Sequence, residues 1–280
     1  MSRLRISAIS YLNTAPLMWD FEHEPTRSQL AEQFEVTYTI PSACAEALRA
    51  GTADIGIIPV AAYATIPNLV VLPGVAIAAL HAVRSILLVS RKPLDEVKTV
   101  ALDTSSMTSV ALCKVLLAKW LGGARKYRPM APNLEIMLAS CDAALLIGDP
   151  ALLIPRTNYP TVIDLAEEWR RYTGKPFVFA FWAVREEAIA GTGIGPVATS
   201  EAMSRLAGVF RRSRDHGLEA KSLEMIVRDW APRLNLSEDD VKSYLTENIF
   251  YELDDSCQEG LRLFYTYAAE YGVLPAVKMA

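Results

Sequence analysis

The 280-residue chain has few of the side chains that most often carry metal or nucleophilic chemistry, with only three histidines and four cysteines. The histidines are far apart in the sequence and have no evident ligand partners: His23, His81 and His216. There is also no glycine-rich phosphate loop, no GxSxG motif and no HExxH motif. These absences argue against metal catalysis and hydride transfer, and we expect neither a metal nor a cofactor.

The cysteines are scattered and lack the spacing of a metal site: Cys44, Cys113, Cys141 and Cys257. Two of them, Cys44 and Cys113, fall within apolar helical patterns, which predicts buried free thiols in a reducing compartment. No apolar segment with a small-residue cleavage site opens the chain, which begins with a strand-like pattern instead. We therefore expect a cytoplasmic protein.

A strong imbalance of charge is lacking as well. The formal net charge of −4 argues against a nucleic-acid partner. The densest basic run, residues 211–214, lies in an amphipathic helical pattern and predicts a solvated helix face rather than an anion site. An apolar stretch at residues 70–83 is interrupted by Pro73 and Gly74 and is too short to span a bilayer, so we expect no membrane partner.

What the sequence does contain is an alternation of strand-like and helical patterns, without an internal repeat. This alternation predicts an α/β fold. The length of 280 residues suits one large domain or two lobes. We expect two lobes joined by two crossings: residues 1–90 with 185–280 form lobe 1, with a helical C-terminal tail, and residues 91–184 form lobe 2. The ligand would lie in the cleft between them.

Several local signals support this arrangement. Residues 4–9, 53–59 and 143–147 read as strands, and Ser42 is positioned to cap a helix over residues 43–50. Asp149 precedes Pro150, which favours a helix N-cap, although its carboxylate could instead serve as a base beside the cleft. Trp182, in a strand-like segment, is predicted to be core.

Neutral hydrogen-bond donors gather at three predicted strand ends. The segment SYLNTAPL at residues 10–17 supplies Tyr11 and Asn13, and Ser85 directly precedes a strand. A run of hydroxyl side chains at residues 104–109 directly precedes a helix, where free backbone N–H groups make an anion site. Such a cluster could hold a carboxylate without any lysine or arginine, although simple helix capping is the alternative.

These segments make the sequence resemble the chorismate dehydratase family of the menaquinone-forming futalosine route. The resemblance begins with SYLNTAPL and continues through residues 48–59, 85–90, 103–110, 142–149 and 173–183 into the helical tail with Tyr251. It implies a two-lobed fold of the periplasmic-binding-protein type (type II) and a dicarboxylate substrate, chorismate. A related family that cleaves cyclic dehypoxanthine futalosine differs in its opening motif and uses a histidine near residues 147–150, where this chain has none.

The resemblance further implies that chorismate loses its ring hydroxyl as water and becomes aromatic. Asn13 cannot act as a base at neutral pH, so we expect the substrate's own side-chain carboxylate to take the proton, with Asp149 as the rival acceptor. Asn13 and Ser85 are the expected catalytic residues. The expected substrate-binding residues are Tyr11, Pro59, Thr104, Ser105, Ser106, Thr108, Ser109 and Asp149.

Two questions stay open at the level of sequence. The competing class is a solute-binding protein without catalysis, which a missing export signal disfavours. The sequence is compatible with a monomer or a homodimer.

Overall fold

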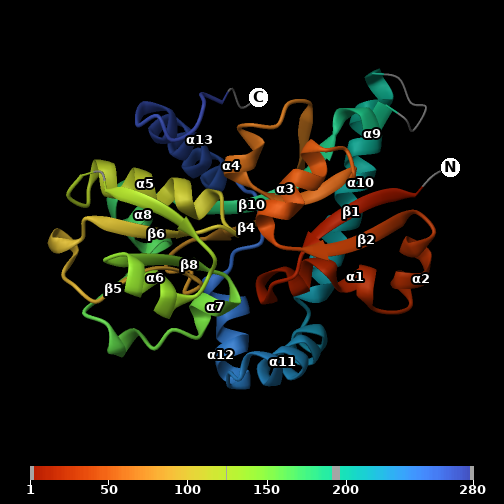
Figure 1. Ribbon diagram of the computed structural model, residues 1–280. Helices are drawn as coiled ribbons and strands as arrows, with labels where there is room; N and C mark the ends of the chain where they lie inside the picture. The colour runs from red at the N-terminus through yellow and green to blue at the C-terminus, as the bar shows by residue number, and fades with distance from the viewer. Residues whose placement is uncertain (1–2, 124, 191–195, 278–280) are drawn as a thin grey trace.

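The computed structural model describes residues 3–123, 125–190 and 196–277 and contains two α/β lobes, each built on a five-stranded sheet (Figure 1). The first sheet has the order β2-β1-β3-β10-β4, with bounds Phe34–Thr39, Leu4–Ile9, Ile55–Pro59, Phe177–Arg185 and Leu69–Ala79. The second has the order β7-β6-β8-β5-β9, with bounds Lys126–Met130, Thr99–Asp103, Ala143–Ile147, Ile86–Ser90 and Thr161–Asp164. The predicted two-lobed α/β fold is confirmed.

The two sheets share one connection pattern. In the first, β1 is parallel to β2 and β3, and β10 is antiparallel to both β3 and β4. In the second, β6 is parallel to β7 and β8, and β5 is antiparallel to both β8 and β9. Each sheet therefore contains three parallel strands, then an antiparallel strand, then an edge strand. This recurrence concerns topology alone, which explains why the sequence shows no repeat.

The two antiparallel strands correct the predicted lobe boundaries. The sequence predicts residues 86–90 in lobe 1, but β5 pairs in the second sheet. It predicts residues 177–184 in lobe 2, but β10 pairs in the first. Residues of β5, and of β10 except at its last position, are buried, so their continuous apolar pattern cannot reveal which sheet they join. Ala79 pairs with Phe177, so the chain leaves and re-enters the first sheet at adjacent positions.

Helices cover both sheets. Those of the first lobe are α1 (Trp19–Glu22), α2 (Thr26–Ala31), α3 (Pro41–Arg49), α4 (Val60–Tyr63), α9 (Glu186–Ala190) and α10 (Pro196–Gly217), with the 3₁₀ helix η1 (Leu12–Met18). Those of the second are α5 (Thr108–Lys119), α6 (Leu134–Ser140), α7 (Asp149–Leu152) and α8 (Leu165–Thr173), with η2 (Leu94–Glu96) and η3 (Arg156–Asn158). Within the described residues, no helix is long and apolar enough to cross a membrane.

The C-terminal tail connects the lobes on two sides. It comprises α11 (Ala220–Leu234), α12 (Glu238–Ser243), the π-helical turn η4 (Tyr244–Asn248) and α13 (Asp255–Glu270). Figure 1 shows α11 and α12 below the two lobes and α13 above α5. An aromatic cluster joins α13 to the second lobe, because the fully buried Trp169 ring of α8 contacts Phe177 at 5.3 Å and Phe264 at 6.3 Å between ring centroids. The tail is therefore part of the lobe junction.

A side chain caps α8, whereas the cap predicted for α3 is not formed. The Asp164 side chain accepts hydrogen bonds from the N–H groups of Ala166 and Glu167 and so caps α8. Ser42 does not cap a helix, since α3 begins one residue earlier at Pro41, whose missing N–H needs no acceptor. The Ser42 N–H instead donates to the Ser105 carbonyl at 3.2 Å, a contact between the lobes.

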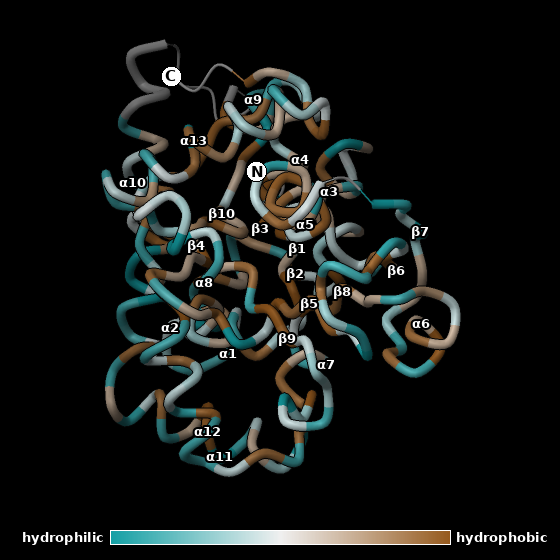
Figure 2. The backbone as a smooth tube through the Cα atoms, turned by 90° about the vertical axis from the view of Figure 1, so that its left-hand side faces the viewer, coloured by the Kyte–Doolittle hydropathy of each residue, from teal (hydrophilic) through white to brown (hydrophobic). Residues whose placement is uncertain are grey.

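The central strands of both sheets are apolar, as the brown tube in Figure 2 shows. Trp182 in β10 is fully buried, in agreement with the core prediction. Cys44 and Cys113 are buried free thiols, also as predicted. These three residues pack in the interior of the lobes and do not line the cavity between them.

The basic run at residues 211–214 is not a solvated face throughout. Arg214 is only 8% exposed, and its guanidinium donates to the Gly74 carbonyl at 2.6 Å. Arg211 covers the same turn, since a Cβ on Gly74 would lie 3.0 Å from its Cδ atom. The run packs α10 on β4, a long-range contact that helical periodicity alone does not predict.

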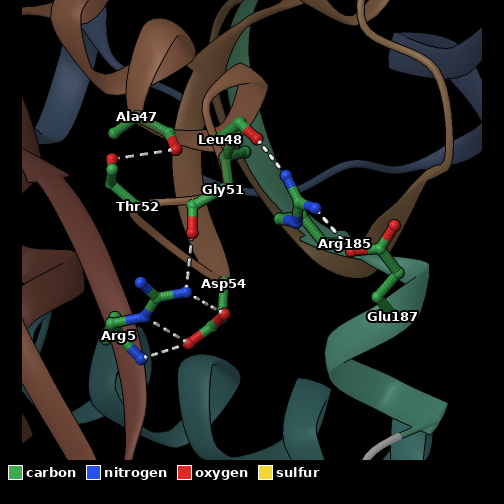
Figure 3. Close-up of polar contacts among 8 residues, drawn as sticks. All are labelled: Arg5, Ala47, Leu48, Gly51, Thr52, Asp54, Arg185 and Glu187. Carbon is green, nitrogen blue, oxygen red and sulfur yellow. Dashed lines mark hydrogen bonds and ion pairs between the residues drawn. The ribbon is translucent and has the colours of Figure 1, made fainter.

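The segment at residues 48–59 is part of the family resemblance. Its first half is held in place by polar contacts with Arg5 and Arg185 (Figure 3). Arg5 donates to the Gly51 carbonyl at 2.8 Å and pairs with the Asp54 carboxylate at 2.7 Å, and Arg185 donates to the Leu48 carbonyl at 2.7 Å. These bonds hold the turn between α3 and β3 and keep the pKa of Asp54 below its usual range, against the opposing effect of burial. Pro59, at the far end of β3, lies at the cleft instead.

Candidate active site

A cavity of about 50 Å³ lies between the lobes at the carboxyl ends of parallel strands from both sheets. Its lining includes Ile9 and Pro59 from the ends of β1 and β3, and Ile147 from the end of β8. Ligands in open α/β sheets bind beyond the carboxyl ends of the strands. The volume is below the roughly 300–1,000 Å³ of an ordinary ligand pocket, and hydrogen bonds between the lobes, such as that from the Ser42 N–H to the Ser105 carbonyl, hold them together beside it.

The first lobe contributes Tyr11 and Asn13 at the start of η1. Both line the cavity and are half-buried. The Asn13 Oδ1 atom accepts a hydrogen bond from the Thr14 hydroxyl at 3.3 Å, which directs its amide N–H groups away from that neighbour. Burial raises the pKa of the Tyr11 hydroxyl, with Asp103 and Asp149 adding to the effect. Both residues are therefore neutral hydrogen-bonding groups at physiological pH.

Ser85 faces them from the start of β5. Its side chain lines the cavity, and only 1% of the residue is exposed. Its backbone carbonyl accepts from the Gly148 N–H at 2.8 Å, and its hydroxyl accepts from Tyr244 at 2.9 Å. The preceding Arg84 has a φ of +63°, so the backbone turns sharply just before the strand. Ser85 is thus fixed on both its main chain and its side chain.

Some hydroxyl side chains of residues 104–109 line the cavity and others do not. Ser106, Thr108 and Ser109 line the cavity. Ser106 accepts from the Ser109 N–H at 3.2 Å, so it closes the first turn of α5 in the manner of a cap. Thr108 is buried and bridges the lobes, because its hydroxyl accepts from the Ala61 N–H at 3.1 Å and donates to the Phe179 carbonyl at 3.0 Å.

Neither Thr104 nor Ser105 lines the cavity, although the Ser105 side chain lies beside Tyr11 and acts to lower its pKa. Thr104 is exposed, and the Ser105 hydroxyl donates at 2.6 Å to Asp103. The Asp103 carboxylate also accepts from the Ile147 N–H at 3.2 Å, which ties the hydroxyl loop to β8. Burial raises the pKa of Asp103, while its hydrogen bonds oppose that shift. These two predicted binding residues shape the loop rather than the cavity wall.

Asp149 is neither a helix cap nor part of the cavity lining. Gly148 occupies the N-cap position of α7, and one Asp149 carboxylate oxygen accepts from the Leu12 N–H at 3.1 Å. Burial raises the pKa of Asp149 to about 6, and the hydrogen bond from Leu12 only partly offsets this. The carboxylate therefore connects the second lobe to the start of η1 in the first.

Sequence reasoning missed the apolar walls of the cavity and the residue behind Ser85. The walls include Met107, Ile77 and Phe179, whose apolar side chains carry no signal that separates a cavity wall from a core. Tyr244 lies 159 residues from Ser85 in the chain, so only the fold brings them together.

Among residues 3–123, 125–190 and 196–277, no group of three His, Cys, Asp or Glu side chains is arranged to hold a metal ion.

A hydroxyl-lined cavity between two lobes, joined by adjacent crossings, defines a two-lobed α/β protein with its candidate site at the lobe interface. The family model described as menaquinone biosynthesis matches residues 4–270, and the chain belongs to that family. It is 32% identical over 273 residues to a chorismate dehydratase of Thermus thermophilus, with 91% of each chain covered. It is 25% identical over 164 residues to a chorismate dehydratase of Campylobacter jejuni, covering 58% of this chain and 66% of that one.

Solved structures agree with the fold class. A protein of Archaeoglobus fulgidus superposes with a TM-score of 0.73 at 16% identity, covering 97% of this chain and 98% of that chain. The alkanesulfonate-binding protein of Xanthomonas axonopodis, solved with MOPS, gives 0.67 at 17% identity and covers 98% and 95% of the two chains. The fold is therefore that of the periplasmic binding proteins.

Proposed function

We propose that this protein is a chorismate dehydratase, a hydro-lyase that converts chorismate to 3-[(1-carboxyvinyl)oxy]benzoate and water for menaquinone biosynthesis. The observation that carries the proposal is the interlobe cavity lined by Tyr11, Asn13, Ser85 and the start of α5, in a chain 32% identical to a curated chorismate dehydratase. The fold supplies the closing lobes, and the cavity supplies neutral donors suited to a dicarboxylate.

The reaction removes a proton from one ring carbon and hydroxide from its neighbour. The electrons of the breaking C–H bond form the new ring double bond, the C–O bond breaks, and the departing hydroxide leaves as water by taking up the proton that the acceptor removed from the ring. The ring becomes aromatic, so the step is strongly downhill. The protein must position a proton acceptor and assist the leaving hydroxyl.

The substrate's side-chain carboxylate is the proton acceptor in this proposal. Asp149, the protein carboxylate nearest to this role, has an oxygen occupied by the Leu12 N–H and does not line the cavity. Asn13 and Ser85 carry no acid or base of suitable strength, but both can donate hydrogen bonds to a carboxylate or a leaving hydroxyl. Holding the reacting groups in this geometry contributes several kcal/mol to such a step.

The second carboxylate of chorismate is assigned to the start of α5. Ser106, Thr108 and Ser109 surround the first turn of this helix, which presents backbone N–H groups and the positive end of its dipole. Among the residues that the structure describes, no lysine or arginine lines the cavity, so in this proposal charge is balanced by dipoles rather than by an opposite ion. Closure of the lobes excludes water and strengthens these interactions.

One assay tests the function directly. Purified protein is incubated with chorismate, and the ultraviolet absorbance of an aromatic product is followed, with heat-denatured protein as the control. We expect the aromatic product to form. Tight binding of unchanged chorismate would instead identify a binding protein without catalysis, and neither binding nor turnover would remove chorismate as the ligand.

The cytoplasm is the proposed location. Cys44, Cys113 and Cys257 are free and buried, in keeping with a reducing compartment. Conversion of an intermediate such as chorismate inside the cell fits the same assignment.

A further inference from the structure

Tyr244 lies directly behind the cavity. It is the first residue of the π-helical turn η4, and only 1% of it is exposed. Its hydroxyl donates to the Ser85 Oγ atom at 2.9 Å. The C-terminal tail thus contributes a hydroxyl that bonds directly to one of the two expected catalytic residues.

The direction of these bonds decides what Ser85 can do. Burial raises the pKa of Tyr244 well above its usual range, so its hydroxyl keeps its proton and can donate. A serine oxygen that accepts this bond still has its own proton to give. Among the residues the structure describes, the Ser85 hydroxyl donates to no protein acceptor, and it faces the cavity.

Asn13 lies on the same cavity as Ser85. Its Oδ1 atom accepts from Thr14, so its amide hydrogens remain for the cavity. Hydrogen bonds linked in series polarise one another in a buried site. The order at Ser85 runs from the Tyr244 hydroxyl to the Ser85 hydroxyl and then into the cavity.

Tyr244 is itself held firmly against the segment that carries Ser85. The Arg84 guanidinium donates to Ser243 at 3.1 Å, and the Asn248 amide donates to the Ala82 carbonyl at 3.0 Å. These two bonds lie on either side of the Tyr244–Ser85 contact along the chain. A π-helical turn is an uncommon local structure that is concentrated at functional sites.

From these contacts we infer that Tyr244 is a positioning residue of the dehydration: it orients the Ser85 hydroxyl so that the serine proton points at the leaving oxygen. The inference rests on the proposed function. Tyr244 does not line the cavity, so it acts through Ser85 rather than on the substrate.

The test compares Tyr244→Phe with Tyr251→Phe. Tyr251 is a second buried tyrosine of the tail, 4% exposed, whose hydroxyl has no hydrogen-bond partner within the described structure. Both variants lose one buried oxygen, but only the first loses a bond to Ser85. We expect Tyr244→Phe to lower kcat about 10-fold with KM within about twofold of wild type, and Tyr251→Phe to match wild type.

A double-mutant cycle separates positioning from a purely structural role. If Tyr244 acts through Ser85, adding Tyr244→Phe to Ser85→Ala lowers kcat no further. Independent, multiplicative losses would overturn the inference, as would an unchanged kcat for Tyr244→Phe. Circular dichroism and the Tm of each variant establish that it is folded. Failure of wild type to form the aromatic product would overturn the proposed function, and this role with it.

Discussion

The Asp149 carboxylate of the second lobe accepts a hydrogen bond from the Leu12 N–H of the first at 3.1 Å, next to the cavity but outside its lining. This contact requires closed lobes, because Leu12 starts η1 and Asp149 starts α7. A carboxylate in this place has two possible roles, interlobe contact or base, and its titration distinguishes them.

The pH dependence of Asp149→Asn tests which role applies. Because burial raises the pKa of Asp149 to about 6, the side chain gains charge as pH rises through that value. A charged Asp149 beside a dicarboxylate weakens its binding, so we expect KM of wild type to rise above pH 6. The variant should keep its kcat and lose this rise. A kcat that is abolished in Asp149→Asn would instead make Asp149 the base.

The same group affects stability with a definite sign. Its pKa is about 6 in the folded protein and 3.8 as an ordinary carboxyl, so the folded state holds more protons between these values. The contribution is fully present below about 3.8 and is lost as pH rises to about 6. The Tm of wild type minus that of Asp149→Asn should therefore fall across this range. A difference that is flat or rises with pH contradicts the shift.

Asn13→Ala should lower kcat strongly without unfolding the protein. The side chain lines the cavity, is half-buried and accepts a hydrogen bond from Thr14, so its loss removes amide donors at the reacting centre. Removing one such donor typically lowers kcat about 100-fold or more. Asn13→Asp is the matched control, since it keeps the shape but replaces the N–H donors by a carboxylate, and it should be equally impaired. Wild-type turnover by Asn13→Ala would remove Asn13 from the mechanism.

Gly148→Ala should prevent full closure of the lobes. Gly148 has φ +66° and ψ −151°, and an added Cβ would lie 2.7 Å from a ring carbon of Tyr11. We expect a higher KM and a lower Tm. Gly174→Ala controls for positive φ, because that glycine has φ +69° and no atom within 4 Å of an added Cβ. If both variants keep the wild-type KM, the contact between Gly148 and Tyr11 does not limit closure.

Thr108→Val should destabilise the closed fold. The hydroxyl satisfies the Ala61 N–H and the Phe179 carbonyl, and the isosteric valine leaves both without a partner. We expect the free energy of unfolding to fall by about 2–4 kcal/mol, measured by urea denaturation. The control is Thr52→Val, at an exposed residue whose hydroxyl bonds only to the Ala47 carbonyl. A Thr108→Val change below about 0.5 kcal/mol would leave this bridge without energetic importance.

Local patterns predicted the parts of the site that depend on neighbouring residues. Tyr11 and Asn13 lie in one short motif, and Ser106 belongs to one run of hydroxyls at a helix start, so their shared position at strand ends was visible in the sequence. The same run misled at Thr104, which points to solvent because successive residues of the loop face different sides. The number of hydroxyl residues in a loop does not tell which of their side chains point toward the cavity.

Long-range pairing was beyond local patterns. The membership of β5 and β10 in opposite sheets, the Asp149–Leu12 bond and the Tyr244–Ser85 bond all join segments far apart in the chain. A buried strand is apolar whichever sheet contains it, and a tyrosine in a helical tail resembles any core tyrosine. Only the folded arrangement gives these residues their partners.

The pairing of Ala79 with Phe177 also determines how the second lobe is placed within the sequence of the first. The segment between them begins and ends on adjacent antiparallel strands, so a short turn in its place could join β4 and β10 into a hairpin. The second sheet is therefore encoded by one continuous segment set within the sequence of the first lobe. Replacing that segment by the corresponding segment of a relative would exchange Ser106, Thr108 and Ser109 together and leave Tyr11 and Asn13 unchanged.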